Sequence, residues 1–168
     1  MSPNHKITML KFIKNLSMLP TTHEALQNSN AIDVLTDLLS SSMKLTQKMS
    51  LNHTTSPRSD ESCEDDKKQR RQCREISNQI LNIMYNLCRL SKDRQEEAAL
   101  NGVIPLLQQI VQTEQPLKEF ALPILCDMAH SGKVGRKILW QNKGLRTYIS
   151  LLGDKYWQVT ALDSILIW

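Results

Sequence analysis

Three segments with the same apolar pattern decide the fold: AIDVLTDLL (31–39), VIPLLQQIV (103–111) and GLRTYISLL (144–152). Their apolar residues match at i, i+3 and i+6, which is the spacing of one face of an amphipathic helix. Each is preceded by a segment of a second kind with helical spacing: MLKFIKNLS (9–17), ILNIMYNLC (80–88) and ALPILCDMA (121–129). The sequence therefore predicts a helical repeat, with Phe12, Ile83 and Ile124 at equivalent core positions.

The distance between the copies gives the period of this repeat. From the second copy to the third, both kinds of segment shift by 41 residues, from 86 to 127 and from 103 to 144. From the first copy to the second they shift by 71 or 72 residues. A period near 41 lies in the range of armadillo and HEAT repeats, and one short helix followed by two long ones is the armadillo order. We predict an all-α, armadillo-type α-solenoid.

The domain organisation follows from the same alignment. We expect one armadillo domain over 1–168, with units at 7–41, 76–112 and 117–153 and the start of a fourth unit at 154–168. The extra residues after the first unit fall in segment 43–74, which is polar and lacks helical periodicity. We predict that this segment is a disordered insertion.

Local signals predict several helix ends. Thr21 with Glu24, and Asp93 with Glu96, have the spacing of capping boxes. Proline lacks a backbone N–H, so Pro123 is expected to end one helix and to begin the next.

Composition limits the class of protein. The 168 residues are 40% hydrophobic and 23% charged, with a net charge of +4, which suits one packed soluble domain. No apolar run approaches the length of a membrane span or of a signal peptide. The four cysteines form no C-x-x-C pair. We expect a cytoplasmic protein with no membrane partner and no metal site.

The sequence carries no recognisable catalytic motif. The Gly-rich loop, H-R-D and D-F-G signatures of kinases are absent, and the four histidines have no i, i+4 spacing. No serine or cysteine stands beside a recognisable base. We therefore expect no enzymatic activity and no cofactor in this chain.

The predicted insertion divides its charges. An acidic run at 60–66 precedes K-K-Q-R-R at 67–71, which fits a nuclear-import signal, a weak nucleic-acid contact or a solvated loop that ends in a basic turn. No aromatic residue interleaves with the basic ones, so nucleic acid is not an expected partner. Ser56 precedes a proline and Ser62 lies three residues before Asp65, so both are candidate phosphorylation sites.

The segments at 31–39, 103–111 and 144–152 are assigned as the third helices of the units, which line the concave face of armadillo proteins. The candidate partner-binding residues on or near that face are Gln108, Gln112, Arg136, Trp140, Lys143 and Arg146. Ordinary solvation explains the polar members equally well, and Trp140 has a rival explanation as a core residue.

The second half of the chain resembles a known family. The stretches NGVIPLLQQIV, ALPILCDMAHSGKVGRKILWQNKGL and YISLLGDKYWQVTALDSILIW are similar to the C-terminal armadillo region of the fungal septation-initiation and mitotic-exit Ste20-like protein kinases. Plant MAP-kinase-kinase-kinase epsilon proteins are related to these. The first 75 residues match that region only in repeat pattern.

The resemblance implies a non-catalytic region of a protein kinase whose kinase domain is not in this chain. It also implies docking to a small Ras-like GTPase in its GTP form, and to a leucine-rich-repeat scaffold at the spindle pole body, in signalling for septation and cytokinesis. One alternative is a peptide carrier of the nuclear-import kind, but the predicted third helices lack its regularly spaced Trp and Asn. Another is self-association through the apolar end at 165–168.

Overall fold

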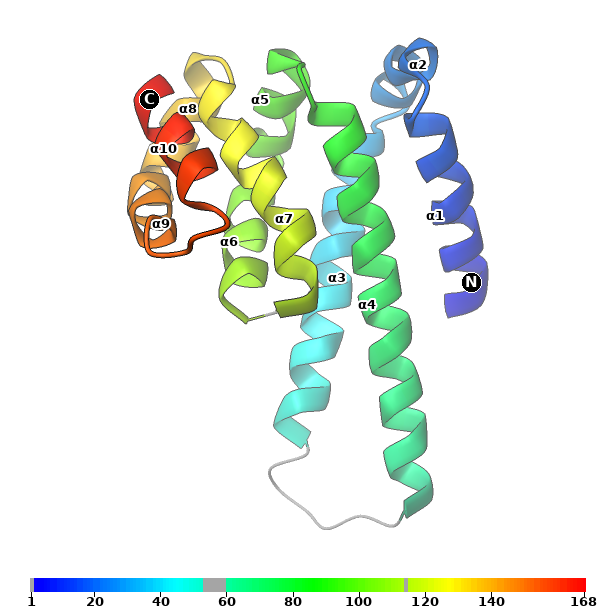
Figure 1. Cartoon of the computed structure of the whole chain (residues 1–168). Helices are drawn as coiled ribbons and strands as arrows, with labels where there is room; N and C mark the ends of the chain where they lie inside the picture. The colour runs from blue at the N-terminus through cyan, green and yellow to red at the C-terminus, as the bar shows by residue number, and fades with distance from the viewer. Residues whose placement is uncertain (1, 53–59, 114) are drawn as a thin grey trace.

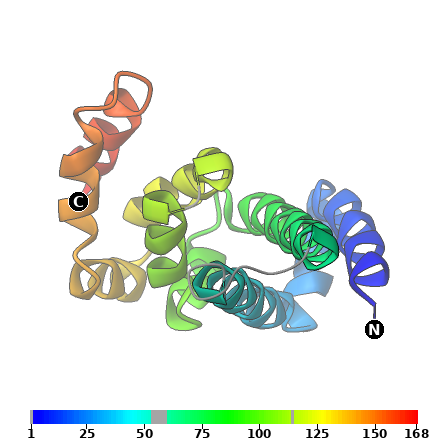
Figure 2. The same ribbon diagram turned by 90° about the horizontal axis from the view of Figure 1, so that it is seen from below.

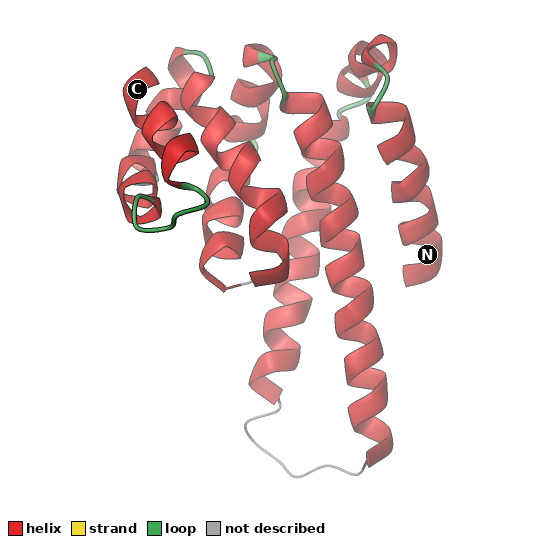
Figure 3. Ribbon diagram, in the orientation of Figure 1, coloured by secondary structure: helices red, strands yellow, loops and turns green. Residues whose placement is uncertain are grey.

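The computed structural model describes residues 2–52, 60–113 and 115–168, with only the backbone described for 51–52, 60–63 and 115. Within these ranges every regular element is a helix, which confirms the predicted all-α class (Figures 1 and 3). The α-helices are α1 (Pro3–Ser17), α2 (His23–Asn28), α3 (Ala31–Asn52), α4 (Asp60–Cys88), α5 (Lys92–Leu100), α6 (Val103–Thr113), α7 (Gln115–Asp127), α8 (Lys133–Gln141), α9 (Gly144–Leu151) and α10 (Gln158–Ile167). Short 3-10 helices at Pro20–Thr22 and Met128–His130 precede α2 and α8.

The helices stack in two layers, and α2, α5 and α8 connect one layer to the other along the chain. α1, α4 and α7 lie side by side in one layer (Figure 2), and α10 contacts α7 and the 3-10 helix at Met128–His130. The second layer places α3 against α4, α6 against α7 and α9 against α10. The short helices α2, α5 and α8 each lead into a helix of the second layer. The chain therefore repeats one order of helices three times before α10.

The predicted apolar stripes form the core between the layers. The buried members include Ile83, Met84, Leu87, Ile104, Leu107, Ile110, Ile124, Leu125, Met128, Tyr148 and Leu151. Each fully buried aliphatic side chain contributes roughly 1.5–3 kcal/mol. Phe12 was expected at an equivalent position, and this is wrong, because 64% of its surface is exposed. It lies on α1, at the end of its layer, where among the described helices only α4 packs extensively on it.

α3 and α4 are far longer than their counterparts. They have 22 and 29 residues, against 11 for α6 and 13 for α7, and they project together beyond the other helices (Figure 1). The predicted disordered segment 43–74 therefore differs from the structure, in which 43–52 and 60–74 are helical. Residues 53–59 lie outside the described residues. The extra residues between the first two repeats therefore lengthen α3 at its C-terminal end and α4 at its N-terminal end.

Sparse contacts hold this extended pair together. Met43 and Met49 of α3 and Cys73 of α4 are buried. The Ser42 hydroxyl donates to the carbonyl of Cys73 at 2.9 Å, and the Ser77 hydroxyl donates to Ser42 Oγ at 3.0 Å. Because the other positions are largely charged or polar, these few contacts produce no clear apolar period in the sequence.

Three predicted helix ends are wrong. Ser91, not Asp93, is the N-cap of α5, and its hydroxyl accepts a hydrogen bond from Arg94 N at 3.5 Å. The N-cap of α2 is Thr22 rather than Thr21. Pro123 lies inside α7 instead of ending it. The buried side chains on both sides of Pro123, at 121–122 and 124–125, favour a continuous helix despite the lost backbone hydrogen bond.

The C-terminal end is partly covered. The Trp168 ring lies edge-on to the rings of Tyr148 and Trp140, with centroid distances of 5.9 Å in both cases. Apolar side chains on α10 remain exposed at Val159 and Leu166, by 71% and 83%. Self-association through this end stays a prediction.

Candidate functional site

A surface pocket between α6 and α9 brings together four of the six predicted partner-binding residues. Gln108, Gln112, Lys143 and Arg146 line it, and its volume is about 370 Å³. The remaining lining residues are Val111, Asn142, Thr147 and Ser150. The candidate residues from two repeats therefore meet in one place.

Gln108 joins the two repeats at the floor of this pocket. Its Nε2 donates to the Asn142 carbonyl at 2.8 Å and to Thr147 Oγ1 at 3.0 Å. Both amide hydrogens are thus engaged within the chain, so Gln108 has a structural role. Gln112 lies one turn further along α6 and is exposed, and so it is the amide that a partner can reach.

The pocket is positively charged. Lys143 stands at the α8–α9 turn with a left-handed backbone (φ 58°), and Arg146 lies three residues later on α9. Both residues are exposed, and among the described residues neither has a carboxylate within 4.0 Å. None of the described residues that line the pocket is acidic. An acidic surface on a partner would therefore be attracted to it.

Arg136 and Trp140 lie outside the pocket. Arg136 Nη1 donates to the Ser131 carbonyl at 3.2 Å, which anchors the start of α8. Trp140 is 62% exposed and contacts Trp168 with one edge. The rival explanation of Trp140 as a core residue is therefore wrong, although the ring helps to cover the end of α10.

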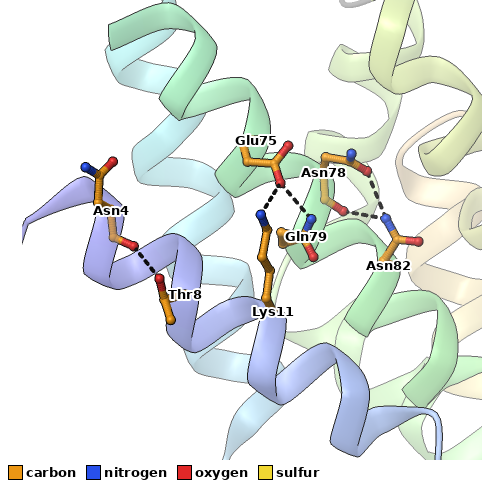
Figure 4. Close-up of polar contacts among 7 residues, drawn as sticks. All are labelled: Asn4, Thr8, Lys11, Glu75, Asn78, Gln79 and Asn82. Atoms are coloured by element: carbon orange, nitrogen blue, oxygen red, sulfur yellow. Dashed lines mark hydrogen bonds and ion pairs between the residues drawn. The ribbon is translucent and has the colours of Figure 1, made fainter. Parts of the chain in front are cut away.

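A polar surface on α4 was missed by the sequence analysis (Figure 4). Asn82 Nδ2 donates to both the carbonyl and the side-chain oxygen of Asn78 at 2.8 Å. Glu75 accepts a hydrogen bond from Gln79 at 2.9 Å and forms an ion pair with Lys11 of α1 at 3.7 Å. This surface belongs to the layer of α1, α4 and α7. The peptide-carrier alternative was considered only for Asn on the segments that form α3, α6 and α9.

The spacing of Asn on α4 was the available signal. Asn78, Asn82 and Asn86 are four residues apart, so they share one face of the helix. Asn86 Nδ2 donates to Ser17 Oγ of α1 at 3.0 Å, which ties the first two repeats together. Asn78 and Asn82 are partly exposed, and Asn78 lines a pocket between α4 and α7.

The candidate phosphorylation sites stay predictions. Ser56 lies outside the described residues, and Ser62 falls in the first turn of α4 with its side chain outside the description. Within the described part of the chain, no cluster of metal-ligating side chains is present and no helix is both long and apolar enough to cross a membrane.

The chain is similar along its whole length to curated fungal proteins. It is 65% identical over 168 residues to "Cytokinesis protein sepH" of Emericella nidulans, covering all of this chain and 11% of that protein. It is 36% identical over 159 residues to "Cell division control protein 7" of Schizosaccharomyces pombe, covering 95% of this chain and 13% of that protein. Over 93 residues, 55% of this chain and 7% of the relative, it is 50% identical to "MAP3K epsilon protein kinase 1" of Brassica napus.

These similarities confirm the resemblance to the septation-initiation kinases and their plant relatives. They also extend it, because the match to sepH includes the first 75 residues and the segment between α3 and α4. The chain spans about a tenth of the length of the relatives it matches. No protein-family profile and no solved structure matches it.

Proposed function

Because this chain is homologous to a segment of the fungal cytokinesis proteins and of plant MAP3K epsilon kinases, we propose that it is a non-catalytic interaction and regulatory module of a cell-division protein kinase. Its helices form armadillo-type repeats, which in the armadillo order begin at the short helices and are α2–α4, α5–α7 and α8–α10, with α1 preceding the first of them. Stacked repeats of this kind provide an extended surface for protein partners.

The proposed partner of the α6–α9 pocket is a small Ras-like GTPase in its GTP form. The observation that carries this proposal is the pair of exposed cations, Lys143 and Arg146, in a pocket whose described lining residues include no acidic side chain. Carboxylates of the partner would pair with these cations, and Gln112 would add a neutral hydrogen-bond donor and acceptor. Complementary charge of this kind raises the association rate and selects the partner.

A second contact would place the kinase at the spindle pole body. The polar surface around Asn78 and Asn82 suits a leucine-rich-repeat scaffold, since the Asn78 amide nitrogen and the Asn82 amide oxygen are not used in the bonds between these two residues and can pair with another chain. The same surface is the one observation that favours a peptide carrier of the nuclear-import kind. However, α1, α4 and α7 contain no Trp, the other residue on which that class relies.

Charge reversal tests the proposed GTPase site. Arg146→Glu and Lys143→Glu would each place a carboxylate where the partner presents its own, so affinity for the GTP-loaded GTPase should fall about tenfold or more. Lys92→Glu is the matched control, because it makes the same charge change at an exposed position in the first turn of α5. Equal affinity of Arg146→Glu and the control would contradict this assignment of the site.

A further inference from the structure

A second pocket lies where the extended α3–α4 pair meets α6 and α7. Its volume is about 270 Å³, and its lining residues come from all four of these helices. Of its described lining residues, Arg70 and Arg74 alone are charged, and Met43 and Leu117 contribute apolar surface. The remaining lining side chains are hydroxyls and amides: Thr46, Gln47, Ser50, Ser77, Gln109 and Thr113.

The two arginines lie on one side of α4, because four residues separate them. Arg70 is held in place by its Nη2, which donates to the Met49 carbonyl at 2.8 Å. Its Nε is buried and has no hydrogen-bond partner. Arg74 is exposed, and in the described part of the chain neither arginine forms an ion pair.

Among the described residues that line this pocket, none supplies an anion for the two arginines. A buried guanidinium nitrogen without a partner costs free energy, and two guanidinium groups one turn apart repel each other. A phosphomonoester carries a charge of roughly −1.5 to −2 at neutral pH and three acceptor oxygens, which suits two arginines surrounded by hydroxyl and amide donors. A carboxylate carries a single charge and would leave half of this positive charge unbalanced.

We propose that this pocket binds the phosphate of a phosphoserine or phosphothreonine side chain on a partner polypeptide. Arg70 and Arg74 bind the phosphate oxygens, and the apolar surface of Met43 and Leu117 accommodates the neighbouring part of the bound chain. A volume of about 270 Å³ suits one phosphate-bearing group, and none of the described lining residues is an aromatic that could stack on a base. Under this proposal, Arg70 of the basic run at 67–71 acts together with Arg74, one turn later on α4, in binding one phosphate.

Titration of the 168-residue chain tests this proposal. The guanidinium Nε–Hε resonances of the nitrogen-15-labelled chain are followed by NMR while inorganic phosphate, acetyl-Gly-phosphoserine-Gly-amide or the unphosphorylated peptide is added. The two phosphate probes are expected to shift the Arg70 and Arg74 signals saturably, and the unphosphorylated peptide to leave them unchanged. Arg74→Gln should weaken the phosphopeptide about tenfold, since a charge-assisted hydrogen bond is lost.

Lys92→Gln is the control for net charge and should bind the phosphopeptide as the wild-type chain does. Among the described residues Arg74 has no hydrogen-bond partner, whereas Arg70 donates to the Met49 carbonyl. Arg74→Gln therefore tests the site without removing a hydrogen bond seen within the described chain. Equal affinity of Arg74→Gln and the control, or equal binding of the unphosphorylated peptide, would overturn the proposal. Binding of phosphoinositide vesicles or single-stranded DNA without binding of the phosphopeptide would overturn the assignment to a polypeptide.

Discussion

Glu96 of α5 caps the N-terminus of α8, where its Oε1 accepts a hydrogen bond from Val134 N at 2.9 Å and a longer one from Gly135 N at 3.4 Å. The residue at the N-cap position of α8, Gly132, has no side chain to do this. A carboxylate from the preceding short helix therefore satisfies backbone donors that would otherwise lack a partner. The cap also links two successive repeats.

Loss of this cap should be measurable. Glu96→Ala is expected to lower the free energy of unfolding by about 1 kcal/mol, as for other helix caps. Gly132→Ala should have a similar effect, because a Cβ at this position would overlap the Glu96 carboxylate and displace it. Urea unfolding of each variant measures both changes.

The double variant and a glycine control complete this test. If Glu96→Ala and Gly132→Ala act through one cap, the double variant should lose less unfolding free energy than the sum of the two single losses. Gly153→Ala is the control, since no atom lies within 4 Å of its added Cβ. Full additivity, or an equal loss in Gly153→Ala, would show that the carboxylate is not the cap.

Tyr148→Phe should destabilise the fold through one hydrogen bond. The buried Tyr148 hydroxyl donates to the Leu125 carbonyl at 2.6 Å, and its removal is expected to cost about 1 kcal/mol. Tyr156→Phe is the matched control, because Tyr156 is 80% exposed. Thermal unfolding compares the two, and equal melting temperatures would contradict the assigned role of this hydroxyl.

The described cysteines should react slowly in the native chain. Burial raises the pKa of Cys88 to about 12 and that of Cys126 to about 11, and it also raises the pKa of Cys73. Thiolate is the reactive form, so these three thiols should be alkylated only as the chain unfolds. A Cys63→Ser variant treated with iodoacetamide near pH 8 tests this, with the urea-unfolded chain as control. Rapid labelling without urea would contradict it.

Asp127 and Asp154 should give pH dependences of opposite sign. Burial raises the pKa of Asp127 above 3.8, so the folded chain binds this proton more tightly than the unfolded chain. The folded chain therefore loses stability as pH rises from 3.8 through the raised pKa. A hydrogen bond from Tyr156 N, then one from Lys118, lowers the pKa of Asp154 below 3.8. Its stabilisation is present above 3.8 and is lost as pH falls through the lowered pKa.

The asparagine variants separate the two effects. Relative to the wild-type chain, Asp127→Asn should become more stable as pH rises from about 3 to about 7, whereas Asp154→Asn should become less stable. Urea unfolding across this range measures both differences. The same sign for both variants would contradict the assigned causes.

The repeated core was predictable because each stripe combines several apolar residues at helical spacing. Ile83, Leu107 and Tyr148 are buried where the alignment of repeats placed them. The extended helices were not predictable in this way, since Met43, Met49 and Cys73 are too widely spaced among charged residues. The extended parts of α3 and α4 are stabilised by packing against each other, and no local sequence pattern shows this contact.

The candidate site was predictable only in part. Lys143 and Arg146 were singled out as exposed basic residues, and the structure places both in the pocket with Gln112. Asn78 and Asn82 were not predicted, because Asn was considered only on the segments that form α3, α6 and α9. The pairing of Arg70 with Arg74 in a pocket depends on α6 and α7 lying against the α3–α4 pair, which the sequence does not encode as a motif.

The most direct test of the central proposal is the affinity of this chain for the small Ras-like GTPase of the septation pathway, measured separately with a GTP analogue and with GDP bound. A regulatory module that recognises the active GTPase should bind the GTP-analogue form at least about tenfold more tightly, a difference of about 1.4 kcal/mol. Equal affinity for the two forms, or no binding to either, would contradict the proposal.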